Sequence, residues 1–309
     1  MVRRKKPSPP RSRAPQSASS GLPPLGVLEE FSQASLSQWR AAGKNLERFG
    51  QAMFFDLERH RAEHSDELME AIRSSTKGPL EFTSWARLVD YKYSNRPLST
   101  EGSIKGDGGR FNIGRTLNPA TYTPFPALYV AEDFPTAYRE RFGIDRGNSD
   151  RGLSASELTL RKDQSFSYVA LEMRVETVLD VGDLDALQAT VNVLRRFKMP
   201  KSVGALARAL RIRLPGLVRS PAGLQKQLLN SHWRVEPVQY SLPSNSQIFG
   251  RLCAAAGVHA ISYPSVRDGD TRCLALFPQN WPKSSSFVEL AGPVPPEVSV
   301  TRIDGGSVV

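Results

Sequence analysis

Apolar residues recur at intervals of three and four between residues 29 and 74, and this is the period of an amphipathic helix. The stripe is formed by Trp39, Ala42, Leu46, Phe49, Met53 and Leu57. Gly78-Pro79 then supplies a signal that ends a helix. The pattern therefore predicts a long helix within an N-terminal helical extension that spans residues 25–78.

Several segments farther along carry the apolar patterns of β-strands. Residues 82–89 and 165–175 are expected to be strands, and residues 127–131 form a short apolar run that is typical of a buried strand. Residues 259–277 indicate a strand, a polar turn and a second strand. Residues 91–105 are polar and rich in turn formers, so they are predicted to form a loop.

Helices are expected between and after these strands. Asp133 is a favourable N-cap and Pro135 fits a first turn, so a helix is predicted from there to about Phe142. Ser202 is a second candidate cap. The other helices are predicted at residues 184–197, 202–210, 223–229 and 247–257.

Both ends of the chain and one internal segment have compositions that favour irregular structure. Residues 1–24 are rich in Pro, Ser and Arg, which predicts a disordered basic tail. Residues 143–164 are polar and poor in apolar residues, which indicates a long loop. Residues 281–309 are rich in Pro, Gly and Ser, so we expect a weakly structured C-terminal tail with one short strand at residues 286–290.

The composition is that of a soluble protein, with 39% hydrophobic residues in a chain of 309. No apolar run approaches the ~18–20 residues that span a bilayer, and the basic N-terminus leads into Pro and Ser rather than into an apolar core. We therefore expect no membrane contact, no secretory signal and a cytoplasmic location. Cys253 and Cys273 lie in apolar surroundings, where reduced and buried thiols are the common state.

The net charge of +10 is concentrated in two segments. Residues 1–24 carry six Lys or Arg and no acid, and residues 195–234 carry ten and no acid. Basic stretches can bind nucleic acid, but the second segment holds only Phe197 and Trp233 as aromatic residues for base stacking. A solvated basic face is therefore the favoured interpretation, and nucleic-acid binding stays an alternative.

A candidate ligand site combines a glycine pair, an aromatic residue and an acid. Gly108 and Gly109 let the backbone turn sharply or approach a ligand closely. Tyr129 lies on the predicted strand that follows, and Glu140 lies on the next helix. Arg87, on an earlier strand, is either an exposed edge residue or an anchor for an anion, because a guanidinium can donate two hydrogen bonds to one phosphate or carboxylate.

Two other motifs suggest chemistry but have simpler interpretations. His60, Glu63 and His64 match the His-x-x-Glu-His pattern of inverted zinc peptidases. Both histidines also continue the apolar stripe, so packing or solvent exposure is the favoured interpretation and no metal is expected. Ser265 follows Pro264 as a simple turn residue, because no nearby histidine and no Gly-x-Ser-x-Gly elbow support a serine hydrolase.

Five short motifs occur in an order that resembles the RES domain family. They are Arg87, Gly-Gly-Arg-Phe-Asn at 108–112, Leu-Tyr-Val-Ala-Glu at 128–132, Thr136-Ala137 followed by Glu140, and Tyr263-Pro264-Ser265 followed by a Leu-Ala-Leu-Phe strand. The family is named for its Arg, Glu and Ser, and it includes toxins of bacterial toxin–antitoxin pairs that degrade NAD. The resemblance covers about residues 82–277.

The resemblance implies an α+β fold like that of ADP-ribosyltransferases, with a split mixed β-sheet core and helices around an NAD cleft. It implies a RES-like catalytic domain at residues 79–280, with a basic helical insertion at about 184–234. NAD would be the substrate and no metal would be needed. The protein would be a bacterial toxin or effector that an inhibitory antitoxin or immunity protein restrains.

The resemblance also implies roles for individual residues. The catalytic residues would be Arg87, Glu140 and Ser265. Arg87 would hold the pyrophosphate, Glu140 would stabilise positive charge that develops on the ribose, and Ser265 would position the ribose or the carboxamide. The residues expected to bind the dinucleotide are Tyr129, which would stack on the nicotinamide or ribose face, Arg110 and Asn112.

The function that this implies is cleavage of the nicotinamide–ribose bond, by hydrolysis or by phosphorolysis. One alternative is an ADP-ribosyltransferase that modifies a protein or a nucleic acid, with the basic helices holding the target. A second alternative is a non-enzymatic nucleic-acid-binding module, whose affinity would fall steeply with salt.

Overall fold

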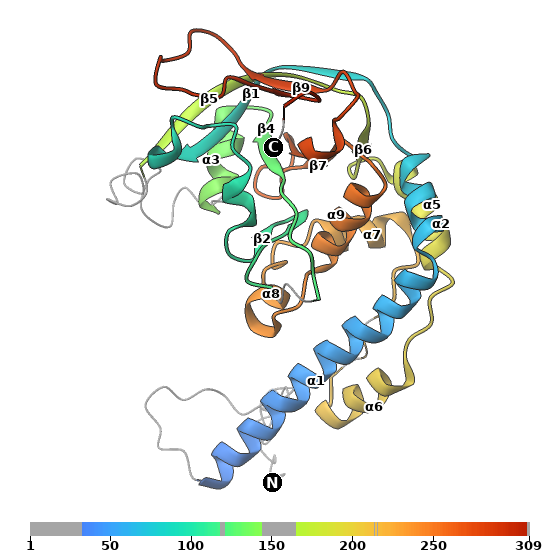
Figure 1. The fold of residues 1–309 in the computed structure, drawn as a ribbon. Coiled ribbons are helices and arrows are strands. Elements are labelled where there is room, and N and C mark those ends of the chain that lie inside the picture. The colour runs from blue at the N-terminus through green and yellow to red at the C-terminus, as the bar shows by residue number, and fades with distance from the viewer. Residues whose placement is uncertain (1–32, 118–120, 144–164, 213, 215, 308–309) are drawn as a thin grey trace, which may run out of the picture.

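The computed structural model describes residues 33–117, 121–143, 165–212, 214 and 216–307 (Figure 1). Its core is a mixed eight-stranded sheet in the order β10-β9-β5-β1-β4-β8-β7-β6, in which β6 and β7 are parallel and the other neighbours are antiparallel. The strands are β1 (Leu80–Asp90), β4 (Leu128–Ala131), β5 (Phe166–Val175), β6 (Val178–Asp180), β7 (Ala260–Pro264), β8 (Arg272–Leu276), β9 (Phe287–Leu290) and β10 (Arg302–Asp304). A separate pair consists of β2 (Gly108–Gly109) and β3 (Asn112–Ile113).

The large sheet is nearly divided between β1 and β4. These two strands share one registered pair, Ala86 with Ala131. In contrast, β1 pairs with β5 along most of its length, and β4 pairs with β8 along all of its length. The sheet therefore consists of two halves, β10-β9-β5-β1 and β4-β8-β7-β6, that meet at a single backbone pair.

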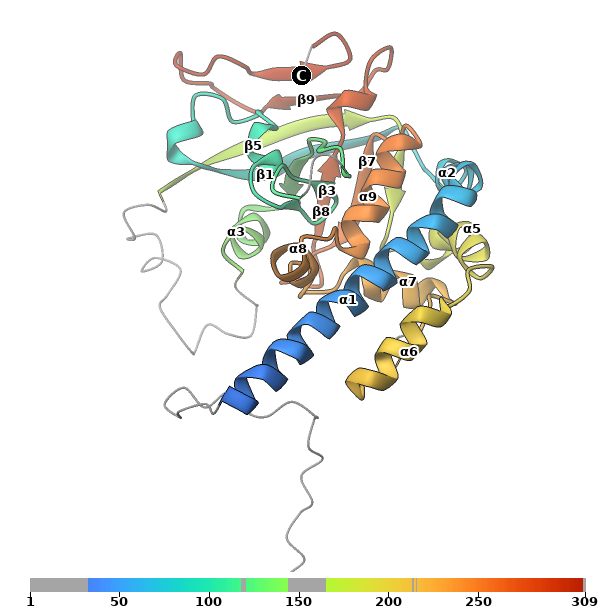
Figure 2. The same ribbon diagram turned by 60° about the horizontal axis from the view of Figure 1, so that its bottom comes forward.

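The described chain has eight α-helices. They are α1 (Gln33–Glu63), α2 (Ser65–Arg73), α3 (Phe134–Phe142), α5 (Leu184–Leu194), α6 (Lys201–Leu210), α7 (Pro221–Leu228), α8 (Val235–Tyr240) and α9 (Asn245–Ala255). Figures 1 and 2 show α2, α5, α7 and α9 gathered on one side of the sheet. The long helix α1 extends away from this body, and α6 packs beside it.

Two apolar cores lie on opposite faces of the sheet, because successive side chains of a strand point to opposite faces. In β4, Val130 packs with Trp281 and Val288 on one face. Ala131 belongs to the other core, which includes residues of α2, α5, α7 and α9 such as Leu187. Both faces are therefore covered, and β4 lies between the two cores.

Most of the predicted elements are confirmed. The strands expected at residues 82–89, 127–131 and 165–175 are β1, β4 and β5. Helix α3 begins at its expected cap, since Asp133 Oδ1 accepts a hydrogen bond from Thr136 N at 2.7 Å. The α+β class is confirmed as well, because the sheet is mixed and its strands and helices are partly segregated along the chain.

The N-terminal helix differs from the expected single element. It is divided into α1 and α2 at His64, and the second helix buries Leu68 and Ile72 completely. The start of α6 also differs, because the helix begins after Pro200 and the Ser202 hydroxyl instead donates to Asp56 Oδ2 at 2.6 Å. Periodicity alone does not reveal either feature, since both depend on contacts with other segments.

The C-terminal segment is more ordered than its composition suggests. Residues 281–309 are expected to be a weakly structured tail, but β9 pairs with β5 and β10 pairs with β9 at the outer edge of the sheet. Trp281 and Val288 are completely buried. The expected strand at residues 286–290 is confirmed as β9, and β10 is an addition that the Pro, Gly and Ser content concealed.

Two expectations lie outside the described residues, namely the basic tail at residues 1–24 and residues 144–164 of the predicted long loop. Helix α8 was not predicted from the sequence, because it is short and contains Pro237. Within the described parts of the chain, no helix combines the length and the apolar character that crossing a membrane requires.

Candidate active site

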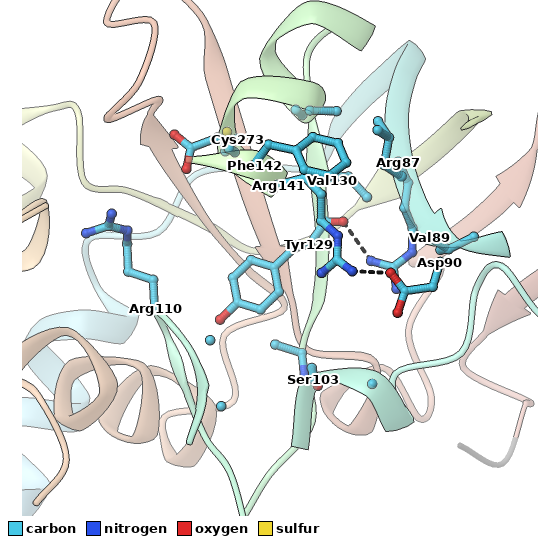
Figure 3. A pocket seen from close by; sticks show the side chains of 18 of the residues that line it. Arg87, Val89, Asp90, Ser103, Arg110, Tyr129, Val130, Arg141, Phe142 and Cys273 are labelled. Carbon is cyan, nitrogen blue, oxygen red and sulfur yellow. Dashed lines mark hydrogen bonds and ion pairs between the residues drawn. The ribbon is translucent and has the colours of Figure 1, made fainter. Parts of the chain in front are cut away.

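A cavity of about 800 Å³ opens at the junction between β1 and β4 (Figure 3). Its walls come from β1, the loop between β1 and β2, β4, α3, β8 and the segments that precede α8 and follow β7. Four of the six candidate catalytic and dinucleotide-binding residues line it together, namely Arg87, Arg110, Tyr129 and Glu140, and the glycine pair Gly108 and Gly109 lines it as well. The fold therefore brings distant segments of the chain to one site.

Arg87 joins the two halves of the sheet at the wall of the cavity. Its Nη1 donates to the Tyr129 carbonyl oxygen in β4 at 2.8 Å, as Figure 3 shows. Its Nε donates to the Pro97 carbonyl at 2.8 Å and its Nη2 to the Ser99 carbonyl at 3.2 Å. Burial lowers the pKa of Arg87 to about 10, so the side chain still carries its charge at neutral pH. Most of its hydrogen-bonding capacity is used within the protein, which makes Arg87 a brace between β1 and β4.

Tyr129 is held by a network that includes Asn112. The Tyr129 hydroxyl accepts from Phe111 N at 2.9 Å and donates to Asn112 Oδ1 at 2.8 Å. Asn112 Oδ1 also accepts from Gly109 N at 2.9 Å, and the amide nitrogen of Asn112 donates to two backbone carbonyls. Asn112 is completely buried behind the wall of the cavity. It positions Tyr129 and does not line the cavity, so the structure does not place it where the expected contact with the dinucleotide would be made.

Gly109 leaves room for the Tyr129 ring. A Cβ at Gly109 would lie 2.4 to 2.6 Å from three atoms of the Tyr129 side chain, whereas a Cβ at Gly102 would meet nothing within 4 Å. We expect Gly109→Ala to lower the free energy of unfolding by about 1–3 kcal/mol, because the ring or the backbone must move. Gly102→Ala is the matched control and should unfold at the wild-type denaturant concentration. Equal denaturation midpoints for the two variants would contradict this packing.

Arg110 connects the cavity to the basic insertion. Its side chain is 8% exposed, and its Nη1 donates to the carbonyl oxygens of Asn230 at 2.8 Å and Leu228 at 3.3 Å. Arg234 lies over the Trp233 ring at 4.5 Å from its centroid. Partial burial and the charges of Arg110 and of Arg267 lower the pKa of Arg234. Arg234 is therefore close enough to Arg110 and to Arg267 for their charges to act on it at this end of the cavity.

Glu140 projects from α3 with one carboxylate oxygen fixed. Its Oε1 accepts from Ser265 Oγ at 2.7 Å, from Val266 N at 2.9 Å and from Arg267 N at 3.3 Å. Among the described residues, none donates a hydrogen bond to Oε2. Ser265 is 3% exposed and lies behind the wall of the cavity, so it orients Glu140. Glu140 is thus a half-buried carboxylate in the cavity with a fixed orientation, and its Oε2 accepts no hydrogen bond from the described residues.

The cavity is strongly cationic. Of the described residues that line it, eight are Lys or Arg and three are Asp or Glu. One of these acids, Asp90, pairs with Arg141, as Figure 3 shows. An excess of cations around a concave site favours a ligand with several negative charges, because the field of the walls adds up inside the cavity. The charge of the site therefore fits a phosphorylated ligand.

Several of these cations were not identified from the sequence. They are Lys92, Arg96, Lys105, Arg141, Arg234 and Arg267. Arg234 belongs to the basic run for which a solvated face is expected, but it lines the cavity. The sequence gives a local signal for Lys92, because it lies between two tyrosines in the Asp-Tyr-Lys-Tyr segment at residues 90–93, directly after the predicted strand that carries Arg87. Only the tertiary fold shows which of the many Lys and Arg residues turn towards the site.

The two histidines of the zinc-like pattern have a packing role. The rings of His60 and His64 stack on Phe197, with centroid distances of 5.4 and 5.8 Å. His64 Nδ1 also lies 3.0 Å from Glu67 Oε1. No group of three or more metal-binding side chains occurs within the portion of the chain that the structure describes. The packing interpretation is therefore the one that the contacts favour.

One protein family matches most of this chain. The sequence model of the RES domain matches residues 84–298. No curated protein matches the sequence. Among solved structures, the chain is similar to one in the crystal structure of the M. tuberculosis MbcT–MbcA toxin–antitoxin complex, with 14% sequence identity, a TM-score of 0.40 and coverage of 74% of this chain and 91% of that chain. Because the family match covers well over half of its length, the chain belongs to the RES domain family.

Proposed function

We propose that the protein degrades NAD by cleaving the bond between nicotinamide and ribose. The observation that carries this proposal is Glu140, a carboxylate whose orientation is fixed by hydrogen bonds to Oε1 and which lines a cavity of about 800 Å³ with many cationic residues. NAD matches this site because it has an anionic pyrophosphate and a ribose on which positive charge develops during cleavage. Membership of the RES domain family supports the same substrate.

Glu140 would act on the ribose. Nicotinamide is a cationic pyridinium in NAD, so it leaves as a neutral molecule and takes the electrons of the broken C–N bond with it. The barrier lies in the positive charge that this leaves on the ribose, and a fixed carboxylate nearby stabilises that charge. Water or inorganic phosphate then forms a C–O bond to the same carbon, and the proton of the acceptor passes to Glu140 or to solvent.

The arginines at the Glu140 end of the cavity would hold the pyrophosphate. Arg110 and Arg234 line the cavity, and the Arg267 backbone nitrogen is bonded to Glu140. A pyrophosphate placed here would lie one ribose away from the reacting bond. Arg87 would act differently from the role that the resemblance implies, because its donors are directed at backbone carbonyls and hold Tyr129 in place.

The direct test is incubation of the pure protein with NAD in the absence of any macromolecule. Release of free nicotinamide is expected, with ADP-ribose as the second product in water and ADP-ribose 1″-phosphate when phosphate is present and serves as the acceptor. Chromatography of the products distinguishes the two acceptors. If nicotinamide appears only after a protein or nucleic acid is added, the chain is an ADP-ribosyltransferase instead.

We also propose that the protein acts as a toxin that an antitoxin or immunity protein restrains, as the RES domain family suggests. Induced expression in bacteria should deplete NAD and stop growth, because NAD is required throughout metabolism. A Glu140→Gln variant produced at the same level should do neither. Growth arrest by both forms would show that any toxicity has another cause.

Ser265→Ala should lower turnover less than a change at Glu140 does. The substitution removes the Ser265 hydroxyl, but two backbone donors still hold Glu140 Oε1. We expect a loss of roughly 10-fold in kcat, in line with one hydrogen bond to a charged group, with little change in KM. Ser265→Thr, which keeps the hydroxyl, should recover part of the rate. A loss confined to KM would instead indicate direct contact of Ser265 with substrate.

A further inference from the structure

A second group of cations lies on the loop between β1 and β2. Lys92, Arg96 and Lys105 come from this loop and line the cavity. Lys92 Nζ and Lys105 Nζ lie 5.1 and 4.8 Å from the centroid of the Tyr93 ring. Lys105 Nζ also donates to the Tyr93 hydroxyl at 3.0 Å, and this contact lowers the pKa of Tyr93. Tyr93 therefore gathers both ammonium groups at one place, which we call the loop cluster together with Arg96.

The charge of the loop cluster is only partly balanced. Glu101 Oε2 lies 3.9 Å from Arg96 Nη2, and both side chains are more than half exposed, so this ion pair is weak. Asp90, which also lines the cavity, is paired with Arg141. Among the described residues that line the cavity, these three cations thus face one carboxylate that is not paired elsewhere, that of Glu101. A phosphate monoester carries a charge of about −1.5 to −2 at pH 7 and would complement this excess.

The loop cluster is separate from the arginines near Glu140. In Figure 3, Arg110 lies on one side of the Tyr129 ring, and Asp90 and Ser103, which belong to the segment around the loop cluster, lie on the other. Arg234 belongs to the Arg110 side, since the charges of Arg110 and Arg267 both lower its pKa, and Arg267 lies beside Glu140, to which its backbone nitrogen donates. The cavity therefore has two cationic ends. A dinucleotide such as NAD has a single pyrophosphate, which occupies one of them.

We propose that the loop cluster of Lys92, Arg96 and Lys105 binds a phosphate monoester at the adenosine end of the substrate, so that the enzyme cleaves NADP as well as NAD. This inference rests on the proposed function. Glu140 fixes the nicotinamide ribose, and the arginines beside it hold the pyrophosphate. The adenosine ribose then extends past Tyr129 to the loop cluster, and its 2′-phosphate is the group that distinguishes NADP from NAD. The nicotinamide ribose, the pyrophosphate and the 2′-phosphate thus follow one another in NADP in the same order as Glu140, the arginines beside it and the loop cluster follow one another along the cavity.

The binding test uses two probes that cannot be cleaved, AMP and adenosine 2′,5′-bisphosphate, with calorimetry on the full chain. Wild type should bind the bisphosphate about 10- to 100-fold more tightly, as expected for one or two hydrogen bonds to a charged group. In Lys92→Gln/Lys105→Gln this preference should fall close to 1. Lys226→Gln, on the exposed face of α7 and outside the cavity, is the control and should keep the wild-type preference.

The subsite is overturned if wild type binds both probes equally, or if the double variant keeps the wild-type preference. Circular dichroism checks that the variants are folded, which is expected because both lysines are exposed. Turnover of NAD and NADP is measured on the same proteins. Cleavage of NAD without a lysine-dependent preference removes the subsite and leaves the proposed function. A lysine-dependent preference without cleavage of either dinucleotide removes the proposed function and leaves the subsite.

Discussion

Glu140→Gln should lower the rate of nicotinamide release from NAD by about 100- to 1,000-fold, which is typical for the loss of one group that stabilises charge in a transition state. The amide is the same size as the carboxylate, and its oxygen can still accept from Ser265 Oγ and Val266 N. The site should therefore keep its shape and lose only the negative charge. The affinity for NAD, measured by calorimetry, should change little.

The matched control for this variant is Glu172→Gln, which makes the same chemical change on an exposed position of β5. It should release nicotinamide at the wild-type rate. A Glu140→Gln protein that is folded and retains most of its activity would show that another group stabilises the ribose. The assignment of the reacting end of the cavity would then be wrong.

Arg87→Ala should lower the free energy of unfolding by about 2–4 kcal/mol, because each buried acceptor that loses its charged donor costs about 1–3 kcal/mol and the strands can relax in part. The substitution leaves the carbonyl oxygens of Pro97, Ser99 and Tyr129 without the donor that satisfies them. It also removes a tie between β1 and β4, which share a single backbone pair. The midpoint of thermal unfolding should fall by roughly 10 °C.

Two variants make this prediction specific. Arg174→Ala removes an arginine of β5 whose partner Glu81 is exposed, and it should change stability by less than about 1 kcal/mol. Arg87→Lys keeps the charge but offers fewer directed donors, so its stability should be intermediate. If Arg87→Ala unfolds like wild type but no longer binds NAD, Arg87 contacts the dinucleotide directly, as the RES resemblance implies.

Local signals were sufficient to predict the elements that carry the site. Helix α3 begins at Asp133 because the side chain satisfies a free backbone N–H, and this requirement can be read from a few consecutive residues. Apolar and polar residues alternate in β5, and β4 is a short apolar run. Both patterns reflect how the side chains of the strand itself are buried, so they can be recognised without knowing which strands lie beside it. Strand β10 could not be predicted in this way, because its pairing with β9 is what orders it.

The chemistry of the site was less accessible than its location. The motif order identified Arg87 and Glu140, and both line the cavity. Arg87 acts as a brace because its guanidinium donates to the carbonyl oxygen of Tyr129, which is distant in the sequence. A local sequence pattern cannot reveal such a contact. Arg234 lines the cavity because the chain before α8 turns towards Arg110. A run of like charges gives no information about which of its members face a site.

The central claim is that NAD lies in this cavity with its nicotinamide ribose at Glu140 and its pyrophosphate beside Arg110. A crystal structure of Glu140→Gln with NAD tests it most directly, because the substrate should persist in this variant. We expect the carbon that bears nicotinamide to lie within about 4 Å of the side chain at position 140, close enough for the carboxylate to act on developing charge. A dinucleotide bound with its nicotinamide end at Lys92 and Lys105, or bound outside the cavity, would contradict the account.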